Sequence, residues 1–251
     1  MKTVVVLAVH KPCALPDDPL YMPVQAGASL HESFLPAGDD AGDQISDKNP
    51  FYCELTVLYW AWKNLDCDFL GLAQYRRLLR GKGKRPLTLA EAEERLSRVP
   101  ILLPEKRRYY IETLWSHYCH TLDPGPLEET RRILAERYEM YLPEFDRLKK
   151  RRSAHMFNLL IMRQDLLDDY CGFLFDVLGE LEQRIDTVGM TAFEARFPGR
   201  ISELLLDVWL FTNGHAYEEV PVLYTEKIHW WKKGTGFLKA KFLGKKYEKS
   251  F

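Results

Sequence analysis

Residues 43–77, DQISDKNPFYCELTVLYWAWKNLDCDFLGLAQYRR, carry most of the information about the fold of this chain. Asn49 is a favourable N-cap and Pro50 suits the first helical position, so a helix is predicted over residues 50–64. Its apolar side chains recur at i, i+3, i+4 and i+7 and form one stripe: Leu55, Leu58, Tyr59 and Trp62. The apolar run Phe69 to Ala73 then predicts a buried strand.

The predicted strand ends in four polar or aromatic residues, Gln74-Tyr75-Arg76-Arg77. Ligands of open α/β sheets bind beyond the carboxyl ends of the strands. Arginine side chains form strong charge-assisted hydrogen bonds with carboxylates and phosphates. The two arginines therefore predict an anion-binding site, and the simpler alternative is a surface ion pair.

The rest of the chain alternates between strand and helix patterns. Strands are predicted at Thr3–Val9, 101–103 and 157–162, and helices at 88–97, 126–140, 166–185 and 200–211, with Asn213-Gly214 as the last stop signal. Two irregular stretches interrupt the pattern, one over residues 12–48 and one after the strand at 101–103. This alternation predicts an α/β protein with a mixed or mostly parallel sheet and helices on both of its faces.

The chain also resembles a bacterial family that occurs in capsule, O-antigen and exopolysaccharide gene clusters. That family was long described only as a domain of unknown function, and it includes galactofuranosyltransferases. The resemblance covers most of residues 4–210 and is dense only in 42–77, in the segments GDQISDKN, YCELT, YWAWKN and GLAQYRR. It implies a GT-A-like fold for residues 1–227, followed by a separate tail over residues 228–251.

Two positions depart from the family pattern. Gln74 stands where the family usually has His, and Gln44 stands where it usually has Asn. A glutamine side chain cannot act as an acid, a base or a cation. Any proton transfer by the family histidine is therefore not expected here, whereas hydrogen bonding from this position can survive.

The resemblance implies a glycosyltransferase that moves a hexose, galactofuranose in some members, from a UDP-sugar to a surface glycan or a lipid-linked acceptor. Donor and diphosphate binding is expected at ten residues: His10, Lys11, Asp43, Ser46, Lys48, Asn49, Gln74, Tyr75, Arg76 and Arg77. Asn158 is the expected acceptor-binding residue, and Glu203 is the candidate general base. Several of these residues have a simpler explanation. His10 could be a structural histidine, the residues from Asp43 to Asn49 a polar helix cap, and Glu203 a glutamate placed near a helix start.

Several residues invite a functional interpretation but have a plainer one. Asp66-Cys67-Asp68 has the Asp-x-Asp form of a metal site but precedes the strand, and His117 and His120 have ligand spacing without an evident third ligand. Asp123 suits a turn, and Trp60 and Trp62 suit the core better than a sugar platform. No metal ligand is therefore assigned, although a divalent cation, Mn²⁺ or Mg²⁺, is compatible with the expected chemistry.

Composition favours a cytoplasmic protein. The five cysteines include no CxxC pair, no signal peptide is expected at the N-terminus, and no apolar run is long enough to span a membrane. The net charge of −1 argues against a nucleic-acid partner. Residues 228–251 differ, because they hold seven lysines and one acidic residue among bulky aromatics. This tail is either a peripheral contact with an anionic membrane surface or an ordinary packed C-terminal segment.

Two other functions remain open from the sequence. A nucleotide-sugar hydrolase or phosphotransferase could use the same anion site. A non-catalytic component of a polysaccharide assembly complex is the second alternative, with Gln74 as the mark of lost activity.

Overall fold

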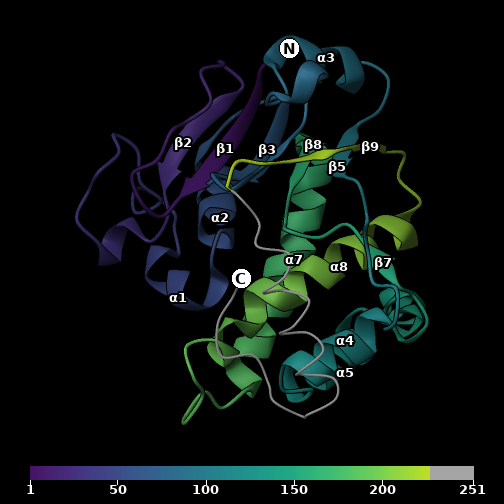
Figure 1. Cartoon of the computed structure of the whole chain (residues 1–251). Helices are drawn as coiled ribbons and strands as arrows, with labels where there is room; N and C mark the ends of the chain where they lie inside the picture. Colours follow the sequence, from purple (N-terminus) through teal and green to yellow (C-terminus); the bar gives the residue numbers. More distant parts are fainter. Residues whose placement is uncertain (227–251) are drawn as a thin grey trace.

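The computed structural model describes residues 1–226, in which a mixed eight-stranded sheet organises the molecule (Figure 1). Its central order is β2-β1-β3-β8-β5-β9, and the short strands β4 and β10 continue from the carboxyl end of β3. The strands are β1 (Thr3–Val9), β2 (Tyr21–Gln25), β3 (Phe69–Gln74), β4 (Arg77–Leu79), β5 (Ile101–Pro104), β8 (Leu160–Arg163), β9 (Glu218–Val220) and β10 (Val222–Tyr224). A separate pair joins β6 (Arg107–Arg108) and β7 (Ser153–Ala154).

Strand direction decides which loops meet. β1 is parallel to β2 and β3, β5 is parallel to β9, and β8 runs antiparallel between β3 and β5. Ala8 is in register with Gln74. The residues that follow β1 and β3 therefore emerge at the same edge of the sheet.

Helices flank this sheet, as predicted. α2 packs on β1 and β3, α7 packs on α2 and α8, and α6 packs on α5 and α8. α4 and α5 lie away from the sheet, below α8 (Figure 1). The helices are α1 (Asn49–Tyr52), α2 (Leu55–Asn64), α3 (Leu89–Leu96), α4 (Leu114–Thr121), α5 (Gly125–Arg137), α6 (Leu142–Asp146), α7 (Gln164–Arg184) and α8 (Phe197–Asn213). No helix within residues 1–226 is long and apolar enough to cross a membrane.

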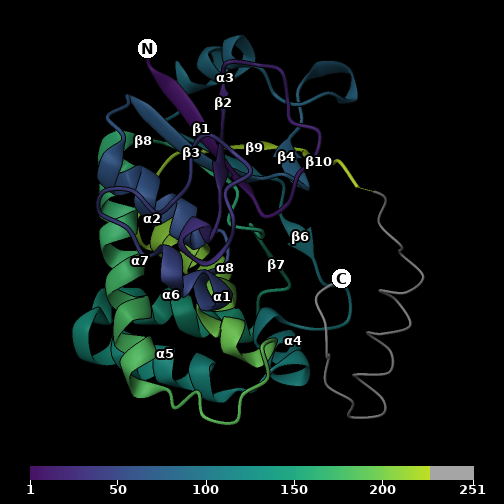
Figure 2. The same cartoon turned by 90° about the vertical axis from the view of Figure 1, so that its left-hand side faces the viewer.

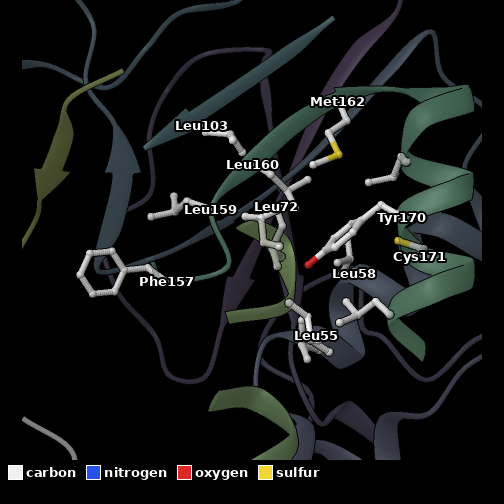
Figure 3. Close-up of a cluster of buried hydrophobic side chains, with 14 of the residues drawn as sticks. Leu55, Leu58, Leu72, Leu103, Phe157, Leu159, Leu160, Met162, Tyr170 and Cys171 are labelled. Carbon is white, nitrogen blue, oxygen red and sulfur yellow. The ribbon is translucent and has the colours of Figure 1, made fainter. Parts of the chain in front are cut away.

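The core lies between the sheet and the α2–α7 pair (Figure 3). Leu55 and Leu58 from α2 meet Leu72 of β3 and Tyr170 of α7, and all four are almost fully buried. Burial of each large apolar side chain stabilises the fold by about 1.5–3 kcal/mol. Phe157 lies apart from this group in Figure 3, and its carbonyl oxygen accepts a hydrogen bond from Gln74, the last residue of β3.

The helix predicted over residues 50–64 is in fact two helices. Cys53 has φ of 53° and separates α1 from α2, and the Asn49 side chain donates a 2.8 Å hydrogen bond to the Cys53 carbonyl oxygen. Asn49 is thus the first residue of α1, whose N-cap is Lys48. The prediction of an Asn49 N-cap was wrong because a 3-10 turn over Ser46–Lys48 leads directly into α1, so Asn49 is already helical. The split at Cys53 was not predicted because a break at a non-glycine residue leaves no mark in the sequence pattern.

Other boundaries also shift. The strand predicted from residue 157 begins at Leu160, because Phe157 and Asn158 have positive φ angles of 78° and 53°. The last helix begins at Phe197 instead of residue 200, so Glu203 lies inside it, not at its start. β2 and α4 form within the stretches predicted to be irregular. The capping box of Thr88 with Glu91 and the left-handed stop at Gly214 are confirmed. The tail at residues 228–251 lies outside the described residues.

Candidate functional site

The carboxyl edge of β1 and β3 gathers the expected cationic residues. His10 and Lys11 follow β1, and the rings of His10 and Tyr75 are 6.3 Å apart. The Lys11 ammonium and the Arg76 guanidinium each lie 5.5 Å from the centre of the Tyr75 ring. The sheet therefore brings together six of the ten predicted donor-site residues: His10, Lys11, Gln74, Tyr75, Arg76 and Arg77.

Gln74 connects three chain segments at this edge. Its side-chain amide nitrogen donates to Glu54 Oε1 at 2.7 Å and to the Phe157 carbonyl oxygen at 2.8 Å. Its amide oxygen accepts a 2.7 Å hydrogen bond from the Arg77 guanidinium. Gln74 is 7% exposed. The glutamine thus orients Arg77 by hydrogen bonding, which is the role that the sequence left open to it.

Asn158 completes the polar network from the other side. Its side chain donates to Glu54 Oε1 at 2.9 Å and accepts a 2.9 Å hydrogen bond from the Ser202 hydroxyl. Asn158 is buried, and its left-handed backbone is held by these contacts. The predicted acceptor residue Asn158 is therefore part of the same hydrogen-bonded group as Gln74, although its side chain is already bound to protein groups. We call this group, with Glu203 described next, the polar cluster: Glu54, Gln74, Arg77, Phe157, Asn158 and Glu203.

Glu203 reaches the cluster from α8. Its Oε1 accepts a 3.0 Å hydrogen bond from the backbone nitrogen of Phe157. Burial and the negative charge of Glu54 raise the pKa of Glu203 to about 7, against the opposing charges of Arg77, Arg107 and Arg200. A carboxyl group that titrates near neutral pH at a polar edge is well suited to accept a proton.

An excess of positive charge lies at this edge of the sheet, around Phe157, His10 and Glu203. Arg77 lies 4.5 Å and Arg107 6.0 Å from the Phe157 ring. Arg76 and Arg196 act on His10, whose pKa is lowered to about 4 by desolvation and by these two charges. Arg76, Arg77, Arg107 and Arg196 form no salt bridge with any carboxylate among residues 1–226, and the Arg76 Nε has no hydrogen-bond partner there. The guanidinium groups are therefore not neutralised by the described part of the chain.

Five predicted donor-site residues have other partners, and one of them is Lys11, which forms a 3.2 Å ion pair with Glu226. Ser46 and Asn49 hold the loop around Asp39 and the α1–α2 break. Lys48 forms a 2.7 Å ion pair with Glu182 of α7, and Asp43 accepts a 3.2 Å hydrogen bond from the Tyr59 hydroxyl. These contacts show a structural role for the other four residues, Asp43, Ser46, Lys48 and Asn49. A role of these residues in donor binding stays a prediction.

The two segments that resemble metal-binding motifs, Asp66-Cys67-Asp68 and the pair His117 and His120, lie outside the polar cluster. Asp68 accepts a 2.6 Å hydrogen bond from the Lys2 backbone nitrogen at the start of β3, the end opposite to Gln74. His117 and His120 contact the two oxygens of the buried Glu112 at 2.9 and 2.7 Å. Within residues 1–226, no group of three or more His, Cys, Asp or Glu side chains is arranged to hold a metal ion.

Several residues in or near the polar cluster were missed from the sequence. Arg196 and Arg200 were not predicted, although together with the predicted Glu203 they occupy positions i, i+4 and i+7 and share one face of the chain entering α8, a spacing that the sequence does contain. Glu54 lies in the segment YCELT, but no role in the site was predicted for it. Arg107 and Phe157 carried no local signal, because β6 and the β7–β8 connection reach the site through long-range packing.

The fold has a clear structural relative. The apo structure of WbbM, a bifunctional glycosyltransferase, superimposes with a TM-score of 0.84 at 25% sequence identity and over 90% of this chain. This chain spans 46% of the WbbM chain. The mixed sheet, its flanking helices and this similarity confirm the GT-A-like α/β fold.

The chain belongs to the family described as a domain of unknown function, DUF4422, whose model matches residues 4–214. The match covers most of the described molecule and includes every residue of the polar cluster. A search of curated proteins finds no significant match.

Proposed function

We propose that this protein is a glycosyltransferase that moves a hexose from a UDP-sugar to a glycan or lipid-linked acceptor. The observation that carries the proposal is Glu203, a carboxyl group with a pKa near 7, close to Arg77 and Arg107, which form no salt bridge with a carboxylate within residues 1–226. The similarity to a bifunctional glycosyltransferase supports the same class of reaction. Galactofuranose as the donor sugar rests on the family resemblance alone.

The arginines supply the electrostatic part of this mechanism. The diphosphate of the donor would lie beyond β1 and β3, where Arg76 and Arg77 can donate hydrogen bonds to its oxygens. As the bond between the anomeric carbon and the phosphate oxygen breaks, its electron pair stays on that oxygen. Fixed guanidinium groups stabilise the departing UDP without reorganising at that moment.

Glu203 supplies the proton transfer. The acceptor hydroxyl gives its proton to the Glu203 carboxylate while its oxygen forms the new bond to the anomeric carbon. The Phe157 N–H fixes the orientation of the carboxylate, and Gln74 and Asn158 hold Glu54 in place beside it. The glutamine in place of the family histidine is compatible with this mechanism, because Gln74 acts here by hydrogen bonding to Arg77 and Glu54 and not by proton transfer.

Donor binding can be tested by calorimetric titration with UDP. Arg76→Ala and Arg77→Ala should each weaken UDP binding about tenfold or more, since each removes a charge-assisted hydrogen bond. Arg98→Ala is the matched control, because Arg98 is exposed and pairs with Glu94 at 3.8 Å. UDP affinity that is unchanged in the Arg76 and Arg77 variants would refute the diphosphate assignment. Repeating the titration with Mn²⁺ or Mg²⁺ tests the cofactor.

Product analysis separates the proposed reaction from its rivals. A UDP-sugar incubated with a lipid-linked acceptor should yield a glycosylated acceptor and UDP. Free sugar as the product would identify a nucleotide-sugar hydrolase instead. UDP binding without any turnover would favour a non-catalytic component of an assembly complex. A place on the cytoplasmic side of the membrane follows from the proposed donor and acceptor and is part of the same proposal.

A further inference from the structure

A surface beside the polar cluster combines positive charge with exposed apolar side chains. Tyr110 is 77% exposed and Ile111 is 59% exposed, and they are the only adjacent pair of exposed large hydrophobic residues within residues 1–226. Exposed cations surround them. We name this surface the basic–aromatic patch, and it consists of Arg107, Arg108, Tyr110, Ile111, Lys149, Lys150 and Arg152.

Backbone pairing makes one surface of two distant segments. β6 pairs with β7, the Tyr109 nitrogen donates to the Arg152 carbonyl at 2.6 Å, and the Leu114 nitrogen donates to the Arg151 carbonyl at 2.8 Å. The Arg152 guanidinium also contacts the Tyr110 carbonyl oxygen at 3.3 Å. β6, β7 and α4 lie together on one side of the molecule (Figure 2). The patch is therefore built by the fold and does not depend on a loop conformation alone.

The cations of the patch are available to a partner. Arg107, Arg108, Lys150 and Arg152 form no salt bridge with another described residue. Among the neighbouring acids, Glu144 binds Arg147 and Arg151, Asp146 binds Arg131 and the patch residue Lys149, and Glu112 is buried against two histidines. Neither segment of the patch contains an acidic residue. Its partner must therefore be anionic.

We propose that the basic–aromatic patch docks the protein on an anionic lipid bilayer. A tyrosine beside an isoleucine, ringed by Lys and Arg, matches the chemistry of the membrane interface, where aromatic rings sit at headgroup level and cations meet anionic lipids. A soluble polyanion would use the cations but would gain nothing from an exposed isoleucine. This surface is separate from the C-terminal tail at residues 228–251.

The patch also adjoins the polar cluster. Arg107 lies 6.0 Å from the Phe157 ring and its charge acts on Glu203. A bilayer on the patch would hold a lipid-linked acceptor on the Glu203 side of the molecule. This last step rests on the proposed function, whereas membrane docking itself does not.

The test is flotation of the full chain with vesicles of phosphatidylcholine, alone or mixed with phosphatidylglycerol, in the absence of nucleotide and sugar. Lys150→Gln/Arg152→Gln should weaken binding to the anionic vesicles about 25-fold, since each cation near the surface contributes about fivefold. Tyr110→Ser/Ile111→Ser should weaken it about tenfold or more through lost apolar insertion. All four side chains are exposed or half-exposed, so these variants should keep their thermal unfolding midpoint.

Matched controls lie far from the patch. Lys82→Gln/Lys84→Gln removes two exposed lysines and is the control for the charge variant. Val188→Ser removes an apolar side chain that is 89% exposed and is the control for the apolar variant. Neither control should change vesicle binding more than about twofold. Unchanged binding in both patch variants would overturn the proposal. Vesicle binding that needs the cations but not Tyr110 and Ile111 would also overturn it, because a purely electrostatic surface does not select a bilayer over a soluble polyanion.

The two proposals can fail separately. Transfer to a water-soluble acceptor is measured on the same variants. Normal vesicle binding without transfer by the unsubstituted chain would refute the proposed function and leave the patch intact. Sugar transfer without vesicle binding would refute the membrane-docking patch and leave the proposed function intact.

Discussion

At the scale of single residues, Glu203 has the sharpest consequence. Its pKa is raised from 4.5 to about 7 by burial and by Glu54, so the carboxylate that accepts a proton forms only as pH rises through 7. We predict that kcat/KM of the donor–acceptor reaction rises about tenfold per pH unit below 7 and levels off above it. Glu203→Gln should lower kcat about 100-fold or more above pH 7 and should remove the pH dependence below it, while UDP affinity changes little. A pH profile that is flat between 5 and 8 would contradict the assignment.

The same group also links stability to pH. The folded chain holds the Glu203 proton up to about pH 7, whereas the unfolded chain releases it near its ordinary value of 4.5. The contribution of this group to stability is therefore present below pH 4.5 and is lost as pH rises through 7. The Glu203→Gln variant should not show this loss, because glutamine does not titrate. Measuring the free energy of unfolding of the variant and of the unsubstituted chain against pH therefore separates the structural effect of the carboxyl group from its catalytic effect.

Gln74 is the residue on which the polar network depends. Gln74→Ala removes hydrogen-bond partners from Glu54, the Phe157 carbonyl and Arg77 at once. Because a buried group without its partner costs about 1–3 kcal/mol, we predict that the free energy of unfolding falls by about 2 kcal/mol or more. UDP affinity should fall as well, through the loss of order in Arg77. Urea unfolding measures the first effect, with Gln164→Ala as control because Gln164 makes one exposed hydrogen bond with Asp168. Equal stability of the two variants would refute the role of Gln74.

At the scale of elements, the sequence predicted what local physics decides. The capping box at Thr88 and Glu91 and the glycine stop at Gly214 satisfy the ends of their own helices, so their sequence signals are reliable. The Phe69–Ala73 strand is equally plain, because an apolar run buried on both faces needs no partner to be recognised. These elements also placed Arg76 and Arg77 at the correct edge of the sheet.

The unpredicted features depend on distant partners. Cys53, Phe157 and Asn158 adopt left-handed backbone conformations without being glycine, and their contacts come from Asn49, Glu203 and Ser202. Local propensity opposes these conformations by about 1–3 kcal/mol each, so only the assembled structure selects them. The parts of the candidate site that the sequence did not indicate, Glu54 and Arg107, reach it through the same long-range contacts.

The long stretch between β1 and α1 illustrates the same dependence and gives a prediction. Asp39 is fully buried, and its carboxylate accepts hydrogen bonds from the backbone nitrogens of Gly27 and Ala28 and from the hydroxyls of Ser46 and Thr56. We predict that Asp39→Ala lowers the free energy of unfolding by about 3 kcal/mol or more, because four donors lose their acceptor together. Asp40→Ala is the matched control, since Asp40 is adjacent and exposed. A difference below about 1 kcal/mol between the two variants in urea unfolding would show that the stretch is held by other contacts.

At the scale of the whole molecule, the candidate site is a meeting point of segments that are far apart in the sequence. His10 follows β1, Gln74 to Arg77 join β3 to β4, Asn158 precedes β8, and Glu203 lies on α8. None of these segments forms the site alone. A ligand that binds all of them stabilises the assembled fold and has no comparable partner in the unfolded chain.

We therefore predict that UDP raises the stability of the entire domain. At 100 times its Kd, UDP should add about 2.7 kcal/mol to the free energy of unfolding, seen as an upward shift of one cooperative thermal transition. At the same concentration UMP should give a smaller shift, because it lacks the second phosphate that Arg76 and Arg77 are proposed to bind. Arg76→Ala/Arg77→Ala should reduce the UDP shift to that of UMP, and Arg98→Ala should keep it in full. Equal shifts with UDP and UMP in the unsubstituted chain would mean that the guanidinium groups beyond β3 do not hold a diphosphate.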